Sequence, residues 1–384
     1  MKMKFKINIL LIIFSSNLII SVYGKEQKQY KSGLRKEDFQ KEIDGKKTDL
    51  FVLTNKNGCE VAVTNYGGAI AAIMVPDKNG KFLNVVHGHD SIENILNSPK
   101  KHLSTLIGRF GNRIKDGKFT LDGKEYQLAQ NNKKNHLHGG PTGFHARVWD
   151  AEQTNDNEVK MHYTSKDGEE NFPGTLQMEV TFSLNDKNEF KISYKGNTDK
   201  KTIINMTHHI FVNLEGLTDP CPTIEDHLLT LNAKFFLPTD ENQIPTGEIK
   251  KVDGTPFDFL TPRRIGERIN DDNPLLKIGD GYDHCFVVNK KNYGELTFAG
   301  KLVAPNSGRT MEIYTTEPGM QMYTANSHNG FKAYHGVRMP RRSGVAFEAQ
   351  HFPDSPNIGF FPSVVLKPGQ TYKQVTIYKF GVEK

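Results

Sequence analysis

Hydrophobic and polar residues alternate with a period of two along much of this chain. Apolar side chains occupy every second position from Leu176 to Leu184 and again from Phe190 to Tyr194, and Asn185-Asp186-Lys187-Asn188 lies between the two runs. A period of two is the spacing of side chains on one face of a β-strand. The pattern therefore predicts two antiparallel strands joined by a tight turn.

Further turn signals divide other apolar runs into hairpins. They are Asn55-Lys56-Asn57-Gly58, Pro76-Asp77-Lys78-Asn79-Gly80 and Asp122-Gly123. Asp-Gly between two strand-like runs is typical of a two-residue hairpin turn. Other runs of strand type cover residues 203–214, 227–231, 296–303, 311–316 and 372–380.

Helical periodicity is nearly absent, and Ser91 to Leu96 is the best short candidate. Many short strands with regular turns predict an all-β fold, a large antiparallel sandwich or barrel. No repeat or linker divides the body, so we expect a single domain over residues 34–384.

Residues 1–24 have the pattern of a secretory signal peptide. Lys2, Lys4 and Lys6 precede a mostly apolar run from Ile7 to Val22, and Gly24 suits a cleavage site. The run is short for a membrane span. We therefore expect a secreted or periplasmic protein without a stable membrane anchor, although an anchor is the alternative.

The net charge argues against a nucleic-acid partner, and the cysteine count argues against a disulfide framework. The formal charge of +6 falls to +3 once the three lysines of residues 1–24 are removed, which is too little for a nucleic-acid binding surface. The three cysteines, Cys59, Cys221 and Cys285, are too few for a disulfide framework, although one bridge remains open. The oligomeric state is also open, and we expect a monomer or homodimer.

Asn135-His136-Leu137-His138-Gly139-Gly140 is the most informative segment. In an extended chain its two histidines share one face, and an imidazole titrates near neutral pH. Three interpretations remain: a metal site, a structural pair, or a catalytic or substrate-binding His138. No carboxylate follows within a few residues, so we expect no metal and no cofactor. His87-Gly88-His89 has the same spacing, and we interpret it as a solvated loop.

Two further segments contain groups that could transfer protons. In Thr207-His208-His209, neighbouring side chains point to opposite faces of a strand, so at most one histidine reaches a shared pocket. A buried structural histidine is the alternative. Glu348 lies between Phe347 and Ala349, and apolar surroundings would raise its pKa toward the range of a general base. A glutamate on a solvent-exposed edge is equally consistent with the local sequence.

Two charged residues suit binding to sugar hydroxyls. Arg113 follows a glycine-flanked segment and could donate forked hydrogen bonds, or could form a surface ion pair. Asp283 precedes His284 and could accept from two hydroxyls. Together with the histidines and Glu348, these residues suit proton transfer on a polar, uncharged substrate.

The chain resembles the aldose 1-epimerase (galactose mutarotase) family from Asn65-Tyr66-Gly67-Gly68 to its last strands. Gly108 to Ile114 resembles the family's Gly-Arg-x-x-Asn-Arg-Ile segment, and Leu137-His138-Gly139-Gly140 its Leu-His-Gly-Gly segment. Asp167 to Gly174 is similar to another, structural signature. The resemblance implies a β-sandwich of the galactose mutarotase-like type with a sugar cleft.

The resemblance also implies roles for single residues. It implies that His209 donates a proton, that Glu348 is the base and that His138 supports the ring oxygen. It further implies that Asn112, Arg113, Asp283 and Gln321 bind substrate. The expected reaction interconverts the α and β anomers of free aldohexoses such as glucose and galactose by ring opening and reclosure, without cofactor or metal.

One segment departs from the family pattern. The family usually has Asn before the donor histidine and a small hydroxyl residue after it, where this chain has His208 and Ile210. A non-catalytic carbohydrate-binding β-sandwich module is the main alternative function, although it would need neither Glu348 nor His209. A glycosidase would use two carboxylates, such as Asp283 with Glu348, and no pocket histidines. A phosphosugar epimerase would need more basic residues in its cleft.

Overall fold

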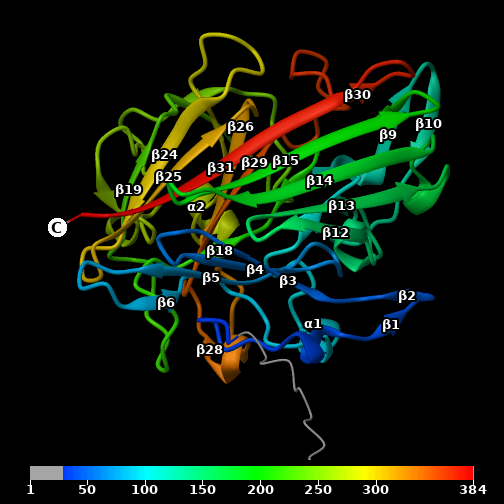
Figure 1. Ribbon diagram of the computed structural model, residues 1–384. Coiled ribbons are helices and arrows are strands. Elements are labelled where there is room, and N and C mark those ends of the chain that lie inside the picture. Colours follow the sequence, from blue (N-terminus) through cyan, green and yellow to red (C-terminus); the bar gives the residue numbers. More distant parts are fainter. Residues whose placement is uncertain (1–28, 384) are drawn as a thin grey trace, which may run out of the picture.

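The computed structural model describes residues 29–383, so the expected signal peptide lies outside the described residues. The largest sheet has nine antiparallel strands (Figure 1). In spatial order they are β12 (Asp150–Asn155), β13 (Glu158–Ser165), β14 (Leu176–Leu184), β15 (Glu189–Thr198), β31 (Tyr372–Val382), β25 (Arg309–Thr315), β24 (Thr297–Val303), β19 (Leu228–Leu231) and β22 (Arg263–Arg264).

Two smaller sheets accompany the nine-stranded one. The six-stranded sheet has the order β18 (Phe211–Val212), β29 (Val345–Gln350), β26 (Gly319–Tyr323), β23 (Asp283–Val287), β20 (Phe235–Leu237) and β21 (Lys250–Lys251). The four-stranded sheet has the order β3 (Leu50–Thr54), β4 (Glu60–Thr64), β5 (Ile70–Pro76) and β6 (Phe82–Asn84), and lies below the large sheet in Figure 1.

Six two-stranded sheets complete the β-structure of the described residues. They are β1 (Glu42–Ile43) with β2 (Lys46–Lys47), β7 (Leu106–Ile107) with β17 (Thr207–His208), β8 (Arg113–Ile114) with β11 (His136–Leu137), β9 (Lys118–Leu121) with β10 (Lys124–Gln127), β16 (Thr202–Ile203) with β30 (Val365–Leu366), and β27 (Phe331–Lys332) with β28 (Arg338–Met339). The two α-helices of the described chain, α1 (Ile92–Asn97) and α2 (Pro274–Gly279), are short. Neither is long and apolar enough to cross a membrane.

The period-two pattern places the main core between the two larger sheets. Val180 and Phe182 of β14 belong to the same buried cluster as Met320, Met322 and Phe347 of the six-stranded sheet. Successive side chains of a strand point to opposite faces. The residues between these core positions therefore lie on the other face of the six-stranded sheet, and this face carries the site.

Most predicted elements are present, and the all-β prediction is confirmed. The hairpin at Asp122-Gly123 joins β9 and β10, and Ser91 caps α1 by accepting the backbone N–H of Asn94. The prediction of one strand over residues 203–214 is wrong. This segment forms parts of three short strands because β16, β17 and β18 pair with β30, β7 and β29 in turn.

Candidate active site

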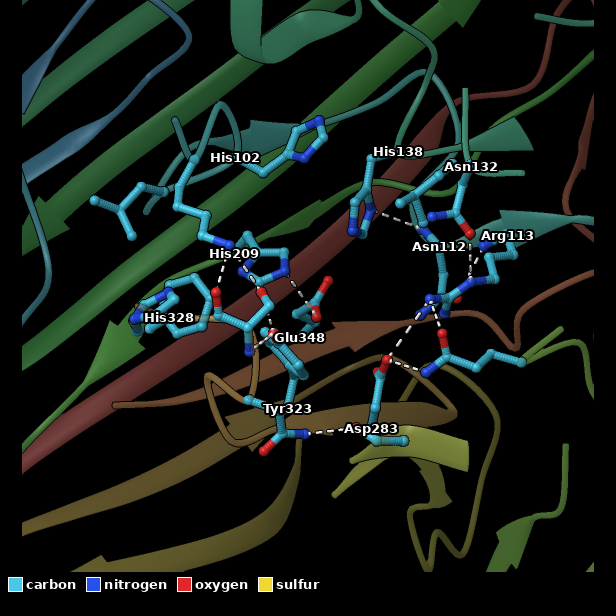
Figure 2. A pocket seen from close by; sticks show the side chains of 18 of the residues that line it. His102, Asn112, Arg113, Asn132, His138, His209, Asp283, Tyr323, His328 and Glu348 are labelled. Carbon is cyan, nitrogen blue, oxygen red and sulfur yellow. Dashed lines mark hydrogen bonds and ion pairs between the residues drawn. The ribbon is translucent and has the colours of Figure 1, made fainter. Parts of the chain in front are cut away.

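A pocket of about 520 Å³ opens above the outer face of the six-stranded sheet (Figure 2). Six of the seven residues that the sequence analysis assigned to the site line this pocket: Asn112, Arg113, His138, His209, Asp283 and Glu348. They come from segments far apart in the chain, and the fold brings them together.

Strand register positions the acidic side of the pocket. Glu348 on β29 pairs with Gln321 on β26, and Gln321 pairs with Cys285 on β23, two residues from Asp283. Glu348, Gln321 and Asp283 thus share the face opposite the main core. Gln321 does not line the pocket, and its Nε2 donates to Asp283 Oδ1 at 2.6 Å.

His209 and Glu348 form a close pair in this pocket. His209 Nε2 lies 3.4 Å from Glu348 Oε1, and both residues are buried. Burial lowers the pKa of His209 to about 4. Burial, followed by the negative charge of Asp283, raises the pKa of Glu348 well above its ordinary value. Glu348 Oε2 is buried and has no hydrogen-bond partner among the described residues.

The backbone fixes the tautomer of His138. The Asn112 backbone N–H donates to His138 Nδ1 at 3.1 Å, so Nδ1 must be the acceptor. Burial lowers the pKa of His138 well below its ordinary value, which keeps the ring neutral. A neutral imidazole carries one proton, and here that proton must lie on Nε2. His138 therefore presents an N–H donor beside His209, whose ring centroid is 5.3 Å away.

Arg113 and Asp283 form the centre of a polar network at the other end of the pocket. Arg113 donates to Asn132 Oδ1 at 3.2 Å and to Gln243 Oε1 at 2.6 Å, and its guanidinium lies 3.6 Å from Asp283 Oδ2. Gln243 Nε2 in turn donates to Asp283 Oδ2 at 2.6 Å. The network holds both charged groups in fixed positions for binding hydroxyls.

Other histidines named from the sequence do not line the pocket. His136 interacts through Nδ1 with the Ala129 carbonyl, so the two histidines of His136-x-His138 do not converge. The interpretation of His87 and His89 as solvated is wrong. Both are buried, because the loop packs against its neighbours and His87 Nε2 lies 3.0 Å from the Ser343 carbonyl oxygen.

Sequence reasoning missed several residues that line the pocket. They are Lys100, His102, Asn132, Gln243, Tyr323 and His328. These residues stand alone in loops or at a strand end, without a motif or a periodic pattern. Their positions depend on long-range packing, such as the edge contact of His102 with His138 at 4.9 Å between ring centroids.

The donor atoms of His138, His209 and Glu348 lie within 4.8 Å of one another, close enough to hold a metal ion. A metal-bound imidazole must offer a nitrogen lone pair. His138 Nδ1 already accepts the Asn112 N–H, and the proton on Nε2 occupies the other position. The cluster therefore fits a hydrogen-bonding site better than a metal site.

Comparison with known proteins identifies the family. A model of the aldose 1-epimerase family matches residues 49–379. The chain is 40% identical to galactose mutarotase from Bos taurus over 323 residues, which are 84% of this chain and 91% of that protein. It is 32% identical to aldose 1-epimerase from Escherichia coli over 342 residues, 88% and 97% of the two chains. The chain belongs to the aldose 1-epimerase family.

Solved structures agree with this family. The crystal structure of an aldose epimerase homologue from C. elegans matches with a TM-score of 0.80 and 28% identity, covering 88% of this chain and all of that one. Galactose 1-epimerase from Lactobacillus acidophilus matches with a TM-score of 0.78 and 27% identity, covering 90% and 97%. The fold is therefore of the galactose mutarotase-like type.

Two segments that resemble signatures of the aldose 1-epimerases contact each other. The buried Arg109 guanidinium donates to the carbonyls of Pro173 and Gly174 at 2.9 Å and to Ser165 Oγ at 2.6 Å. Arg109 thus anchors the segment Asp167 to Gly174. The signature is structural because its backbone carbonyls satisfy a buried cation.

The residues that depart from the family pattern beside His209 lie in the interior. His208 Nε2 lies 2.9 Å from the Gly68 carbonyl oxygen, and Ile210 belongs to the main hydrophobic cluster. On the pocket side, the His209 ring contacts Phe211 at 4.7 Å between centroids. His208 and Ile210 therefore pack on the interior side of His209, and the aromatic ring of Phe211 lies on the side that faces the pocket.

Proposed function

We propose that this enzyme interconverts the α and β anomers of free aldohexoses such as glucose and galactose. The observation that carries this proposal is the His209–Glu348 pair, 3.4 Å apart in a pocket that also contains the Arg113–Asp283 network. A cyclic aldose is a hemiacetal. Opening its ring requires one group that removes a proton from the anomeric hydroxyl and one that protonates the ring oxygen.

Glu348 removes the proton of the anomeric hydroxyl, and His209 gives its proton to the ring oxygen. The bond between C1 and the ring oxygen breaks, and the O1 electron pair forms the aldehyde carbonyl. Rotation about the C1–C2 bond exposes the other face of C1, and the reverse proton transfers close the ring to the other anomer. Positioned acid–base groups contribute roughly 10² to 10⁴ in rate.

The remaining pocket residues bind the sugar and stabilise developing charge. The His138 Nε2–H donates a hydrogen bond to the sugar ring oxygen and stabilises the negative charge that develops on it. Asn112, Arg113 and Asp283 bind hydroxyls. Gln321 acts through Asp283, whose Oδ1 it holds at 2.6 Å, and is a positioning residue.

The rival functions explain less of this geometry. A glycosidase would need a second free carboxylate beside Glu348. Gln243, Gln321 and Arg113 hold the oxygens of Asp283, so this carboxylate can still accept from a hydroxyl but is not free to act as an acid or a nucleophile. A non-catalytic binding module would need only the network around Arg113, and burying Glu348 beside His209 would serve no purpose there.

We also propose that the protein is exported, as a monomer or a homodimer. The charged start and apolar run of residues 1–24 support export. Mass spectrometry of exported protein should find a mature N-terminus near Lys25. Exported protein that still carries residues 1–24 would refute the signal peptide.

Polarimetry tests the proposed reaction directly. Freshly dissolved α-glucose, α-galactose and α-xylose change rotation slowly on their own, and the enzyme should accelerate that change toward the same equilibrium value. Full acceleration of glucose and galactose would establish the activity. Binding of these sugars without any acceleration would favour the carbohydrate-binding module.

A further inference from the structure

The carboxylates that line the pocket all have basic partners, whereas Lys100, which lines the same pocket, has no acidic partner among the described residues. Each carboxylate has a basic partner 2.7 to 3.6 Å away. These carboxylates are Asp280, Asp283 and Glu348. Lys100 lines the same pocket, and within residues 29–383 both hydrogen-bond partners of its Nζ are oxygens of Ser327, a neutral residue.

The Lys100 ammonium group retains bonding capacity. It donates to Ser327 O at 2.7 Å and to Ser327 Oγ at 2.9 Å. An ammonium has three N–H donors, so one remains for a ligand. The side chain is half-buried, and burial lowers the pKa of Lys100. A partly desolvated cation without a counter-ion is unfavourable, and an anionic ligand would remove that cost.

Contacts place Lys100 on the His209 side of the pocket. Ser327 Oγ, which Lys100 contacts, lies 2.8 Å from the Tyr323 hydroxyl, and the Tyr323 ring lies 6.1 Å from that of His209. His328 follows Ser327 in the chain. Figure 2 shows His328 and Arg113 at opposite ends of the pocket, with His209 and Glu348 between them.

The order of groups along the pocket sets the direction of a bound pyranose. Figure 2 shows His209, Glu348 and Asp283 following one another. In the proposed reaction His209 faces the ring oxygen and Glu348 faces the anomeric hydroxyl on C1. C2 is the next ring atom after C1, so it lies toward Asp283. C5 is then the next ring atom on the far side of the ring oxygen. Its substituent C6 extends toward Lys100.

We propose that the pocket binds aldoses with an anionic group at C6, a hexuronate or a hexose 6-phosphate, and that Lys100 is the counter-ion of that group. This inference rests on the proposed anomer interconversion and defines its substrate class. A carboxylate and a phosphate share the chemistry that an ammonium recognises, and the experiment below separates them.

Anomer exchange should be measured at low ionic strength with D-glucose, D-glucuronate and D-glucose 6-phosphate. In the wild-type enzyme the KM for at least one anionic sugar should lie about tenfold below that for glucose, because a hydrogen bond to a charged group is worth roughly this factor or more. The sugar that shows this advantage identifies the anion. Salt should weaken its kcat/KM more than that of glucose.

Lys100→Gln should lower the ratio of anionic to neutral kcat/KM by about tenfold or more, and Lys100→Arg should largely keep it. Lys118→Gln is the control, because the exposed Lys118 does not line the pocket and its Nζ donates to Glu125 Oε1 at 3.0 Å. Its ratio should stay close to the wild-type ratio. If Lys100→Gln fails to fold, the wild-type enzyme provides the test. A ratio of anionic to neutral kcat/KM that falls with added salt supports the role of Lys100, and a ratio that does not change with salt refutes it.

Two outcomes separate the two proposals. Wild-type activity on glucose with no advantage for either anion, or a ratio that Lys100→Gln leaves intact, would refute the role of Lys100 while supporting the proposed function. Absence of exchange for all three sugars would refute the proposed function itself, and the substrate class with it.

Discussion

His209 Nε2 lies 3.4 Å from Glu348 Oε1, with both side chains withdrawn from solvent. Burial disfavours the charged form of each group, so the pKa of His209 falls to about 4 while that of Glu348 rises well above its ordinary value. Between these two pKa values the pair holds one proton. The fraction with this proton on His209 and a charge on Glu348 does not change with pH there.

This shared proton predicts a broad pH plateau for kcat/KM. As pH falls through about 4, the pair takes up a second proton and loses its base, so the rate falls. As pH rises through the raised pKa of Glu348, the pair loses its last proton and with it the acid, so the rate falls again. A pH–rate profile with buffer controls measures both limbs. An acid limb near pH 6 to 7, the ordinary range of histidine, would contradict the assignment.

Arg113→Ala should weaken sugar binding more than turnover. Arg113 is proposed to contact hydroxyls in the ground state and the transition state alike, so its loss should raise KM by about tenfold or more with a smaller change in kcat. Steady-state kinetics with glucose would separate the two constants. An unchanged KM with a collapsed kcat would show that Arg113 takes part in the chemical step.

Asp283→Asn should move the alkaline limb to lower pH. The negative charge of Asp283 is one cause of the raised pKa of Glu348, and its removal lowers that pKa. The pair then loses its last proton at a lower pH. Comparison of wild-type and variant pH profiles checks the direction, and a limb that moves upward would be inconsistent with the proximity of the two carboxylates.

Arg109→Leu should destabilise the fold without directly changing the pocket. The substitution removes hydrogen bonds to Pro173, Gly174 and Ser165 and leaves buried carbonyls unpaired, which should cost about 3 kcal/mol or more. Urea unfolding measures this change. Arg35→Leu is the control at an exposed ion pair and should have little effect.

EDTA should not reduce activity. His138 Nδ1 accepts a backbone N–H, so His138 offers no lone pair to a metal. The proposed chemistry needs only proton transfers. Dialysis against EDTA followed by polarimetry tests this point, and activity lost to EDTA and restored by zinc or manganese would overturn it.

Local patterns in the sequence were sufficient for much of the fold. The alternation from Leu176 to Leu184 and the Asp122-Gly123 turn depend on neighbours in the chain, and both appear in the structure. Asn273-Pro274 was missed, although Asn273 caps α2 and Pro274 stands at its start, a known helix-start signal.

The site was only partly predictable, because its remaining contacts are long-range. Motifs identified His138, His209 and Glu348, and the fold brings their side chains together. No local signal could show that Gln243 would hold Asp283 or that Lys100 would line the same pocket. The burial of His87 was also missed, because it depends on Ser343, 256 residues away in the chain.

The most direct test of the proton-transfer mechanism is the kcat of Glu348→Gln and His209→Asn. Each substitution removes one of two required proton transfers and should lower kcat by about 10² or more. Circular dichroism and unfolding curves should confirm that both variants fold. Folded variants with kcat reduced to this extent are the predicted result. Folded variants that interconvert anomers at the wild-type rate would contradict the mechanism.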